Sequence, residues 1–502
     1  MRKLIDTFLA QARGNIARAF STSLLGIFSG LFTSLVLLRA IVLEVDVSDF
    51  STYAIALQLT AYLSVLQMGL DFAASREIAE RLGAEDKIGA NQAFWELHRF
   101  NRRMTALAAG TVVLVSGALW FWGSLEGAES NKSLMAEIVL LSGLGQVLQS
   151  LARPYVAALV GSRRQPMVNV IQLLNSLLTG VLAYALLKLG VGVFCLPMAG
   201  LLIWAITLMV FKQVSTKHTS WRSLTACPPD KAAFKRIFKF GGLSTVGGVA
   251  WTVESTSDIF ILGLATSPAV VAAYVVWWRI PQMLFDLCTR LAYSAFPDMA
   301  HRNSKGEEEI RGLFSKVAWA SLFLGTLACV GIGIWLPTFV GHWLGGMHKV
   351  ANEHQIAVMM GVLVLLRVVS NFMGLFSFSQ NSMSRPVISS IAQAVVKVGL
   401  GILLVQRFGL GGVLAASVLA SLIPLILIGA ELLKNQTLAT RDFRAFLLIG
   451  VISIIIPIFF RFGVDPRGIS YFIIGAILTS MVWATFVFTF MKVSGRRALA
   501  PS

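Results

Sequence analysis

The sequence has 502 residues, of which 56% are hydrophobic and only 13% are charged. A soluble globular chain carries about a quarter charged residues, so this composition excludes a soluble protein and predicts an integral membrane protein. The net charge of +17 would favour a nucleic-acid partner in a soluble chain, but here most basic residues lie in short loops between apolar segments. No cofactor is expected, and the four cysteines lack the spacing of metal ligands: Cys195, Cys227, Cys288 and Cys329.

The N-terminal segment, residues 1–20, places four basic side chains among leucine, isoleucine and phenylalanine residues. This pattern is typical of an amphipathic helix at the membrane surface. A cleavable signal would instead have one uninterrupted apolar core before a small-residue cleavage site.

Apolar runs long enough to cross about 30 Å of hydrocarbon then follow one another along the chain. They predict an all-α membrane protein with about fourteen transmembrane helices. The approximate spans are 20–42, 52–74, 104–123, 134–159, 167–188, 191–211, 241–265, 268–296, 315–339, 355–378, 387–406, 410–432, 445–464 and 470–491.

The basic residues alternate between loops as the positive-inside rule requires. If the N-terminus is inside, the outside loops hold only Lys132, Lys349, Arg407 and Arg467 among the basic residues. Both termini are therefore predicted to lie in the cytoplasm.

An internal repeat with an offset of 221 residues relates the two halves of the chain. Tyr53 and Ala79-Glu80-Arg81 in the second span correspond to Tyr274 and Ala300-His301-Arg302 in the eighth. We predict two six-helix lobes of equal orientation, followed by two additional spans. The predicted boundaries are 1–211 for the N-terminal lobe, 212–240 for a cytoplasmic linker, 241–432 for the C-terminal lobe and 433–502 for the added spans and tail.

The seventh and eighth spans carry charges at depths where a membrane tolerates few. Glu254 and Asp258 are four residues apart and share one helical face. Because two close carboxylates repel each other in a low dielectric, they are candidates for binding Na⁺ or carrying a proton; pairing with neighbouring arginines is the alternative. Asp286 is a third ion-coupling candidate, and Pro281 is the predicted hinge.

Depth separates candidate ligands of an anion from side chains that reach the membrane surface. Arg279, Arg367 and Lys397 lie about ten or more residues from either end of their spans, too deep to extend to water. They predict an electropositive chamber for an anionic headgroup, and structural ion pairs with the acidic residues are the alternative. Three further candidate substrate ligands lie nearer the membrane surfaces: Arg290, Arg153 and Arg39.

The six-six-two order of spans, the basic amphipathic start and the charged seventh and eighth spans resemble the multidrug/oligosaccharidyl-lipid/polysaccharide exporter superfamily. The stretch Gly69-Leu70-Asp71-Phe72-Ala73-Ala74-Ser75-Arg76-Glu77-Ile78-Ala79, interpreted as the loop after the second span, looks like the corresponding stretch of Wzx-type polysaccharide flippases. Arg279-Ile280-Pro281 with Ala295-Phe296-Pro297 is similar to the eighth-span pattern of these flippases and of the lipid II flippase branch.

The resemblance implies two lobes that form a V around a central cavity, which opens alternately to the two sides of a bacterial inner membrane. It implies a polyprenyl-pyrophosphate-linked oligosaccharide as the substrate, flipped for O-antigen, capsule or exopolysaccharide export alongside polymerase or export partners. In the lipid II branch, arginines of the first and eighth spans face the pyrophosphate. Arg279 matches the eighth-span position, whereas Arg39 lies near the outer end of the first span.

Two other functions fit parts of the pattern. An ion-coupled multidrug or cation antiporter of the same superfamily would favour an acidic chamber, and the deep cations argue against it. A membrane glycan polymerase or ligase generally has a large outside domain, whereas the longest outside loop here, 341–354, is short. The sequence shows no nucleophile elbow or phosphate-cradling glycine loop, so a transporter is favoured over an enzyme.

Overall fold

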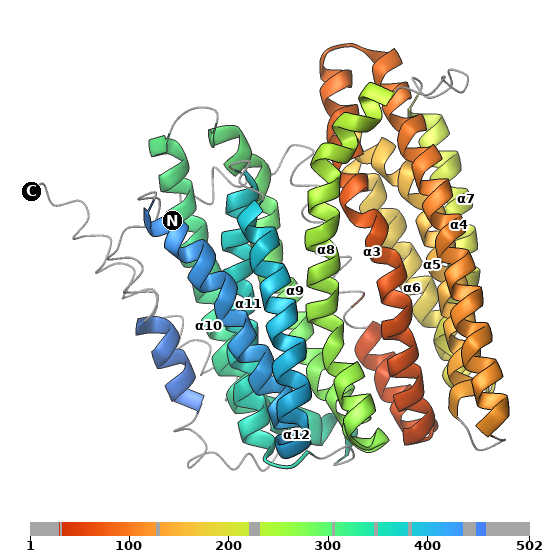
Figure 1. The fold of residues 1–502 in the computed structure, drawn as a ribbon, viewed down its shortest axis with the longest axis vertical. Helices are drawn as coiled ribbons and strands as arrows, with labels where there is room; N and C mark the ends of the chain where they lie inside the picture. Colours follow the sequence, from red (N-terminus) through yellow and green to blue (C-terminus); the bar gives the residue numbers. More distant parts are fainter. Residues whose placement is uncertain are drawn as a thin grey trace, which may run out of the picture. The chain divides into compact units, whose positions relative to one another are not determined.

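The computed structural model describes residues 30, 33–126, 131–219, 231–303, 307–345, 350–379, 384–434 and 448–457. Within these ranges the regular structure is helical and contains no β-strand (Figure 1). The predicted all-α fold is therefore confirmed. The amphipathic N-terminal segment and the last predicted span, 470–491, lie outside the described residues.

The helices follow the predicted spans but extend beyond them. α4 begins at Lys87, well before the apolar run that starts at residue 104. A helix satisfies its backbone hydrogen bonds within the segment, in water as in lipid, so it continues past the hydrocarbon. In chain order the elements are α3 Val47–Gly83, α4 Lys87–Glu126, α5 Asn131–Gly161, α6 Gln165–Lys188, the 3₁₀ turn η1 Gly192–Phe194, α7 Cys195–His218, α8 Lys231–Ala265, α9 Pro268–Asn303, α10 Glu307–Leu344, α11 Glu353–Ser379 and α12 Ser384–Lys434.

α12 contains two spans rather than one. At Gly409 the backbone adopts φ 53° and ψ −130°, a conformation that favours glycine and interrupts the helix. Gln393 in the first half donates a hydrogen bond to Ser421 in the second, and Arg385 lies 3.5 Å from Glu431. The two halves therefore run antiparallel, and they correspond to the eleventh and twelfth predicted spans.

The chain divides into two compact units, Met1–Thr256 and Ser257–Ser502, and the boundary falls within α8. In the first unit α3, α4 and α5 pack against one another, and α7 packs against both α5 and α6. In the second unit α9, α10 and α11 pack against one another, and α12 packs against α11. Each unit is thus built on a trio of mutually packed helices.

The helix bounds support the internal repeat. α3 begins at Val47 and α9 at Pro268, a separation of 221 residues, and Gly180 in α6 has the same separation from Gly401 in α12. A Cβ atom on Gly180 would overlap the side chain of Thr33, and one on Gly401 would lie 2.7 Å from the side chain of Ile261. Small residues at such points let two membrane helices approach closely, and the same device occurs at the matching place in both units.

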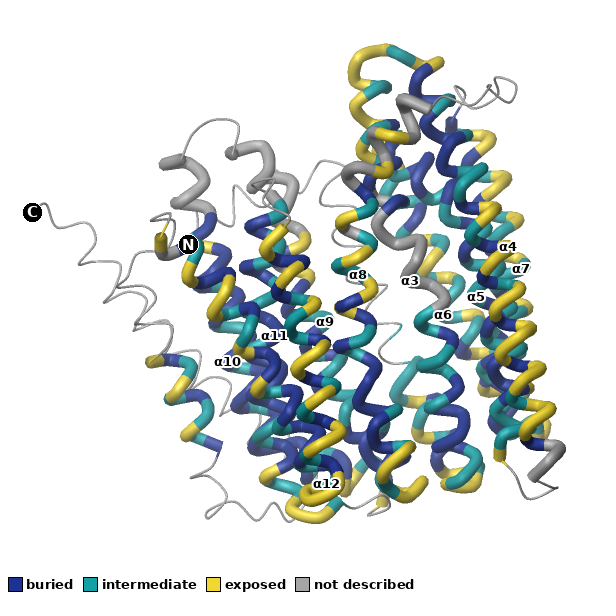
Figure 2. The backbone as a smooth tube through the Cα atoms, in the orientation of Figure 1, coloured by how far each residue is buried: buried dark blue, intermediate teal, exposed yellow. Residues whose placement is uncertain are grey.

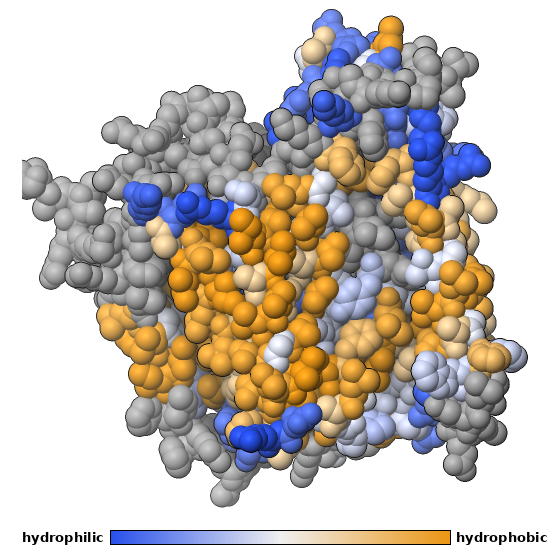
Figure 3. Space-filling view, in the orientation of Figure 1, coloured by the Kyte–Doolittle hydropathy of each residue, from blue (hydrophilic) through white to orange (hydrophobic). Residues whose placement is uncertain are grey.

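The burial pattern is that of a protein surrounded by lipid. Within the described ranges, seven helices are long and apolar enough to cross a membrane. The most apolar window of α10 is 72% buried, against 22% in α6. α10 is therefore largely buried within the second unit, whereas most residues of α6 are of intermediate exposure or exposed (Figure 2). Hydrophobic side chains cover the drawn face of the second unit, and hydrophilic ones lie at both ends of its helices (Figure 3).

The stretch 69–79, predicted to be a loop, lies inside α3, so the prediction of a loop was wrong. The composition changes there because the helix leaves the apolar environment, while the backbone remains helical. Arg81 forms ion pairs with Glu77 in the same helix and with Asp86 in the turn before α4. Asp86 also accepts a hydrogen bond from the Gly89 N–H at the start of α4, and these bonds, the one from Gly89 foremost, lower the pKa of Asp86.

Helices also extend into the predicted linker, 212–240. α7 reaches His218 and α8 begins at Lys231, so much of this segment is helical. Cys227-Pro228-Pro229 lies outside the described residues.

We expect Gly361→Ala to destabilise the protein by about 1–3 kcal/mol. A Cβ atom on Gly361 in α11 would lie 2.6 Å from the backbone oxygen of Cys329 in α10, and backbone cannot rotate away as a side chain can. The measurement is thermal unfolding of the purified protein in detergent.

The matched control is Gly374→Ala on the same helix, where a Cβ atom meets nothing within 4 Å. Alanine has the higher helix propensity, so this variant should unfold at or above the wild-type temperature. Equal unfolding temperatures for the two variants would contradict the described packing of α10 on α11.

Candidate functional site

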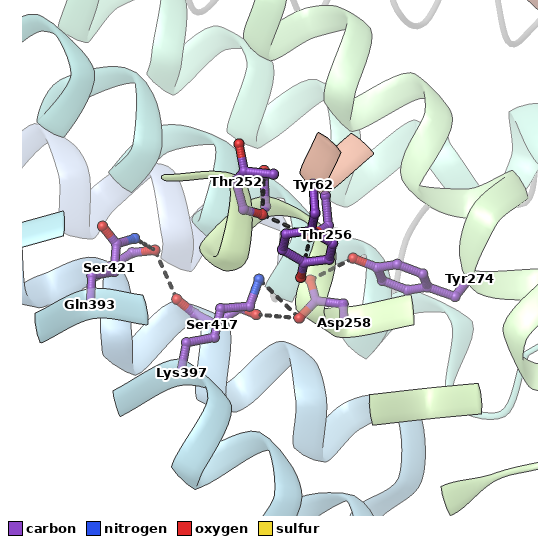
Figure 4. Close-up of polar contacts among 10 residues, drawn as sticks. Tyr62, Thr252, Thr256, Asp258, Tyr274, Gln393, Lys397, Ser417 and Ser421 are labelled. Carbon is purple, nitrogen blue, oxygen red and sulfur yellow. Dashed lines mark hydrogen bonds and ion pairs between the residues drawn. The ribbon is translucent and has the colours of Figure 1, made fainter. Parts of the chain in front are cut away.

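A buried ion pair joins α8 and α12 in the second unit (Figure 4). The Lys397 ammonium lies 2.9 Å from Asp258 Oδ1, and the two side chains are 0% and 2% exposed. Removing such ions from water costs several kcal/mol each, so they are stable in a protein interior only when each has close polar partners.

Two hydroxyl groups complete the surroundings of the Asp258 carboxylate. Tyr274 on α9 donates a hydrogen bond to Oδ2 at 2.7 Å, and Ser417 in the second half of α12 donates one to Oδ1 at 3.1 Å. The Ser421 hydroxyl in turn donates to the Ser417 backbone oxygen. Side chains from α8, α9 and both halves of α12 therefore meet at one carboxylate (Figure 4).

Close helix packing brings this pair together. On α12, Lys397 and Gly401 are one turn apart, and on α8, Asp258 and Ile261 are one turn apart, so each pair shares a helical face. Because Gly401 has no side chain, Ile261 packs against it. α8 thereby comes near enough to α12 for the carboxylate to reach the ammonium.

An aromatic stack extends from this site along α9. The ring of Tyr274 stacks on that of Trp278, with centroids 6.3 Å apart and planes at 4°. The Arg367 guanidinium of α11 lies 5.2 Å from the Trp278 ring, a cation–π contact. Arg367 is 7% exposed, so it is a buried cation one contact beyond the stack that starts at Asp258.

A second, more exposed polar face of α9 carries the other predicted charges. Arg279, Asp286 and Arg290 are spaced seven and four residues apart and share a face distinct from that of Trp278. Arg279 is partly exposed and Arg290 is exposed, and both interact electrostatically with Asp286. Gln282 donates a hydrogen bond to the Asp286 carboxylate at 3.1 Å.

The remaining predicted residues are distributed over both units. In the first unit Arg153 Nη1 lies 3.0 Å from Asp71 Oδ2, and Arg39 is exposed. Glu254 is buried one helical turn from Asp258. Pro281 is buried inside α9, and its role as a hinge stays a prediction.

The structure changes the assignment of Lys397. As a candidate substrate ligand it requires an accessible ammonium, but the side chain has no exposed surface and is held by Asp258. The geometry corresponds to the ion pair that was the alternative. Arg367 is also mostly buried, which leaves Arg279 and Arg290 as the predicted cations of this unit with exposed surface.

Sequence reasoning missed Ser417, and it did not connect Tyr274 to the charged residues. The repeat singles out Tyr274 only as the counterpart of Tyr53, yet a tyrosine inside a predicted membrane span has a hydroxyl that needs a partner, which is a usable signal. Ser417 lies in an alanine-rich segment and has no sequence feature that distinguishes it from a packing residue.

The fold is similar to those of solved membrane-transporter structures. The chain matches no protein-family model. It superposes on the lipid II flippase MurJ in an inward closed conformation with a TM-score of 0.69 and 15% identity, covering 96% of this chain and 99% of MurJ. It superposes on an inward-facing multidrug resistance MATE family transporter of the MOP superfamily with a TM-score of 0.66 and 16% identity, over 83% of this chain and all of the other.

The chain has the fold of the MOP transporter superfamily. A MOP transporter from Pyrococcus furiosus, described by the reversed polarity of its binding pocket, is also similar, with a TM-score of 0.64 and 16% identity, over 83% of this chain and 95% of that one. Among curated proteins, the probable low-salt glycan biosynthesis flippase Agl15 of Haloferax volcanii is 22% identical over 194 residues. That match spans 38% of this chain and 41% of the relative. The resemblance inferred from the sequence is confirmed as a shared fold.

We expect Asp258 and Lys397 to be strongly coupled in a double-mutant cycle. Asp258→Asn or Lys397→Met alone leaves a buried charge without its partner and should destabilise the protein by about 3–5 kcal/mol. The double variant should lose less stability than the sum of the losses of the two single variants, and the interaction energy should exceed about 2 kcal/mol. Stability is measured by unfolding in detergent with choline as the only added cation.

The control cycle uses Arg385 and Glu431, whose side chains are 49% and 15% exposed. A partly exposed pair contributes less than about 1 kcal/mol. Interaction energies of similar size in the two cycles would show that the pair at Asp258 is not buried as described.

Proposed function

We propose that this protein flips a polyprenyl-pyrophosphate-linked oligosaccharide across a bacterial inner membrane by alternating access, with both termini in the cytoplasm. The lipid tail stays in the hydrocarbon while the charged headgroup crosses through the protein. The glycan delivered is a repeat unit of a cell-surface polysaccharide.

The observation that supports this proposal is that Arg279, partly exposed, and Arg290, exposed, share one face of α9. Arg279 keeps exposed surface at mid-depth of a predicted span, where charged side chains are rare and commonly functional. A guanidinium binds two phosphate oxygens at once through parallel N–H donors. A pyrophosphate carried through the membrane is a ligand that would make such an arginine useful.

In this proposal the other charged residues contact or influence the headgroup at successive positions along α9. Arg290 lies three turns further along the same face and is exposed, so it makes the first contact with an entering headgroup. Asp286 interacts with both arginines and competes with the phosphate for them, which favours release. Arg367 adds positive potential from α11 without touching the substrate.

Arg153 and Arg39 are candidate contacts of the first unit at other stages of the cycle. Arg153 is held by Asp71 and would have to exchange that carboxylate for a phosphate. Arg39 is exposed near the outer end of its span and would meet the headgroup late.

The relatives are consistent with this proposal. One structural neighbour is a lipid II flippase, and the curated relative is a probable glycan biosynthesis flippase. The MATE neighbours favour the second candidate, multidrug export on the same fold. The partly exposed Arg279 argues for an anionic substrate over a cationic drug, because the guanidinium would repel a positively charged drug.

We expect Arg279→Ala to slow flipping by at least about tenfold, since the loss of a charge-assisted hydrogen bond costs about 1.5–3 kcal/mol. The assay uses proteoliposomes that contain a fluorescent polyprenyl-pyrophosphate oligosaccharide, and it scores the loss of protection from a membrane-impermeant quencher. The flipping rate of Arg279→Lys should lie between those of the wild type and Arg279→Ala, because lysine keeps the charge but loses the bidentate geometry.

The control is Arg385→Ala, which removes a half-exposed arginine paired with Glu431 at an end of α12. It should flip the lipid at the wild-type rate. Wild-type flipping by Arg279→Ala would refute the assignment, and uptake of a cationic dye without any glycan-lipid flipping would favour the multidrug transporter.

A further inference from the structure

We infer that the Asp258 site is a monovalent-cation site whose cation is part of the chain: the Lys397 ammonium occupies the place that Na⁺ takes once the lysine is replaced. The wild-type protein therefore binds no exchangeable cation at Asp258. This inference does not depend on which substrate the protein transports.

The oxygen atoms around the Lys397 ammonium have the chemistry of a cation site. Carboxylate and hydroxyl oxygens are the ligands that hard cations prefer, and here the carboxylate of Asp258 and the hydroxyls of Tyr274 and Ser417 come from three helices. Each hydroxyl donates its hydrogen to Asp258 and retains oxygen lone pairs. The ammonium at 2.9 Å from Asp258 Oδ1 is a compact charge in this oxygen-rich enclosure.

The second argument comes from the internal repeat. The positions 221 residues before Lys397, Asp258 and Ser417 are Ser176, Leu37 and Leu196. Ser176 on α6 faces the first span, since its hydroxyl oxygen would lie 3.4 Å from a Cβ atom on Gly30. At these matching positions the first unit has a serine and two leucines, which are uncharged, so the same helix contact forms there without an ion pair.

The third argument is the cost of the pair. A buried ion pair is often replaced by apolar residues with no loss of stability, so packing alone does not explain its presence. A tethered ammonium keeps Asp258 neutralised without drawing on the cations of the surroundings.

The experiment compares the response of the wild type and Lys397→Met to Na⁺. Methionine keeps the length of the lysine side chain up to Cε and omits the ammonium, which leaves a space at the position of the nitrogen. Thermal unfolding of the full chain in detergent is followed while NaCl replaces choline chloride at constant ionic strength. We expect the unfolding temperature of Lys397→Met to rise by at least about 2 °C with Na⁺, and that of the wild type to stay constant.

Two controls make each result decisive. The double variant Asp258→Asn with Lys397→Met lacks the carboxylate and should show no response to Na⁺. Lys397→Arg keeps a tethered cation and should also show none. A Lys397→Met protein that folds and is indifferent to Na⁺ would overturn the inference, as would equal responses of the single and double variants.

The wild type supplies an independent test if Lys397→Met cannot be purified. A specific stabilisation of the wild type by Na⁺ that disappears in Asp258→Asn would mean that the site takes an exchangeable ion, and the inference would fail. Constant stability of the wild type across the exchange of Na⁺ for choline supports it.

Discussion

The energetic constraint on this protein is the cost of holding charges away from water, and the interaction that meets it is the ion pair between Asp258 and Lys397. Both side chains are almost completely buried. The pair is stable because Tyr274 and Ser417 also bond the carboxylate. Through these contacts one residue of α8 is fixed to α9 and to both halves of α12, so the pair orders the second unit around a single carboxylate.

α9 separates two kinds of charge. One face connects the ion pair to Arg367 through the rings of Tyr274 and Trp278. Its other face carries Arg279 and Arg290, which keep exposed surface. A neutralised interior beside a face with accessible arginines would suit the carrier of an anionic headgroup that we propose.

The sequence predicted the membrane class and the order of the spans well, because hydrophobic length and loop charge are local properties. It did not locate the helix ends, as at residues 69–79, because hydropathy marks the edge of the hydrocarbon and not the end of hydrogen bonding. It marked Lys397 and Asp258 as deep charges but could not pair them, because they are far apart in sequence and meet where Gly401 lets α8 approach α12. Ser417 looked like any small residue of a tightly packed helix.

We propose that the face of α9 that carries Arg279 and Arg290 meets water, whereas the Asp258 site is sealed. The most direct measurement is the reaction of single cysteines with a charged, membrane-impermeant thiol reagent in a cysteine-free background. Arg279→Cys should react and be protected by a polyprenyl pyrophosphate, whereas Ser417→Cys should not react in the folded protein. Rapid labelling at Ser417→Cys together with an inert Arg279→Cys would contradict the account.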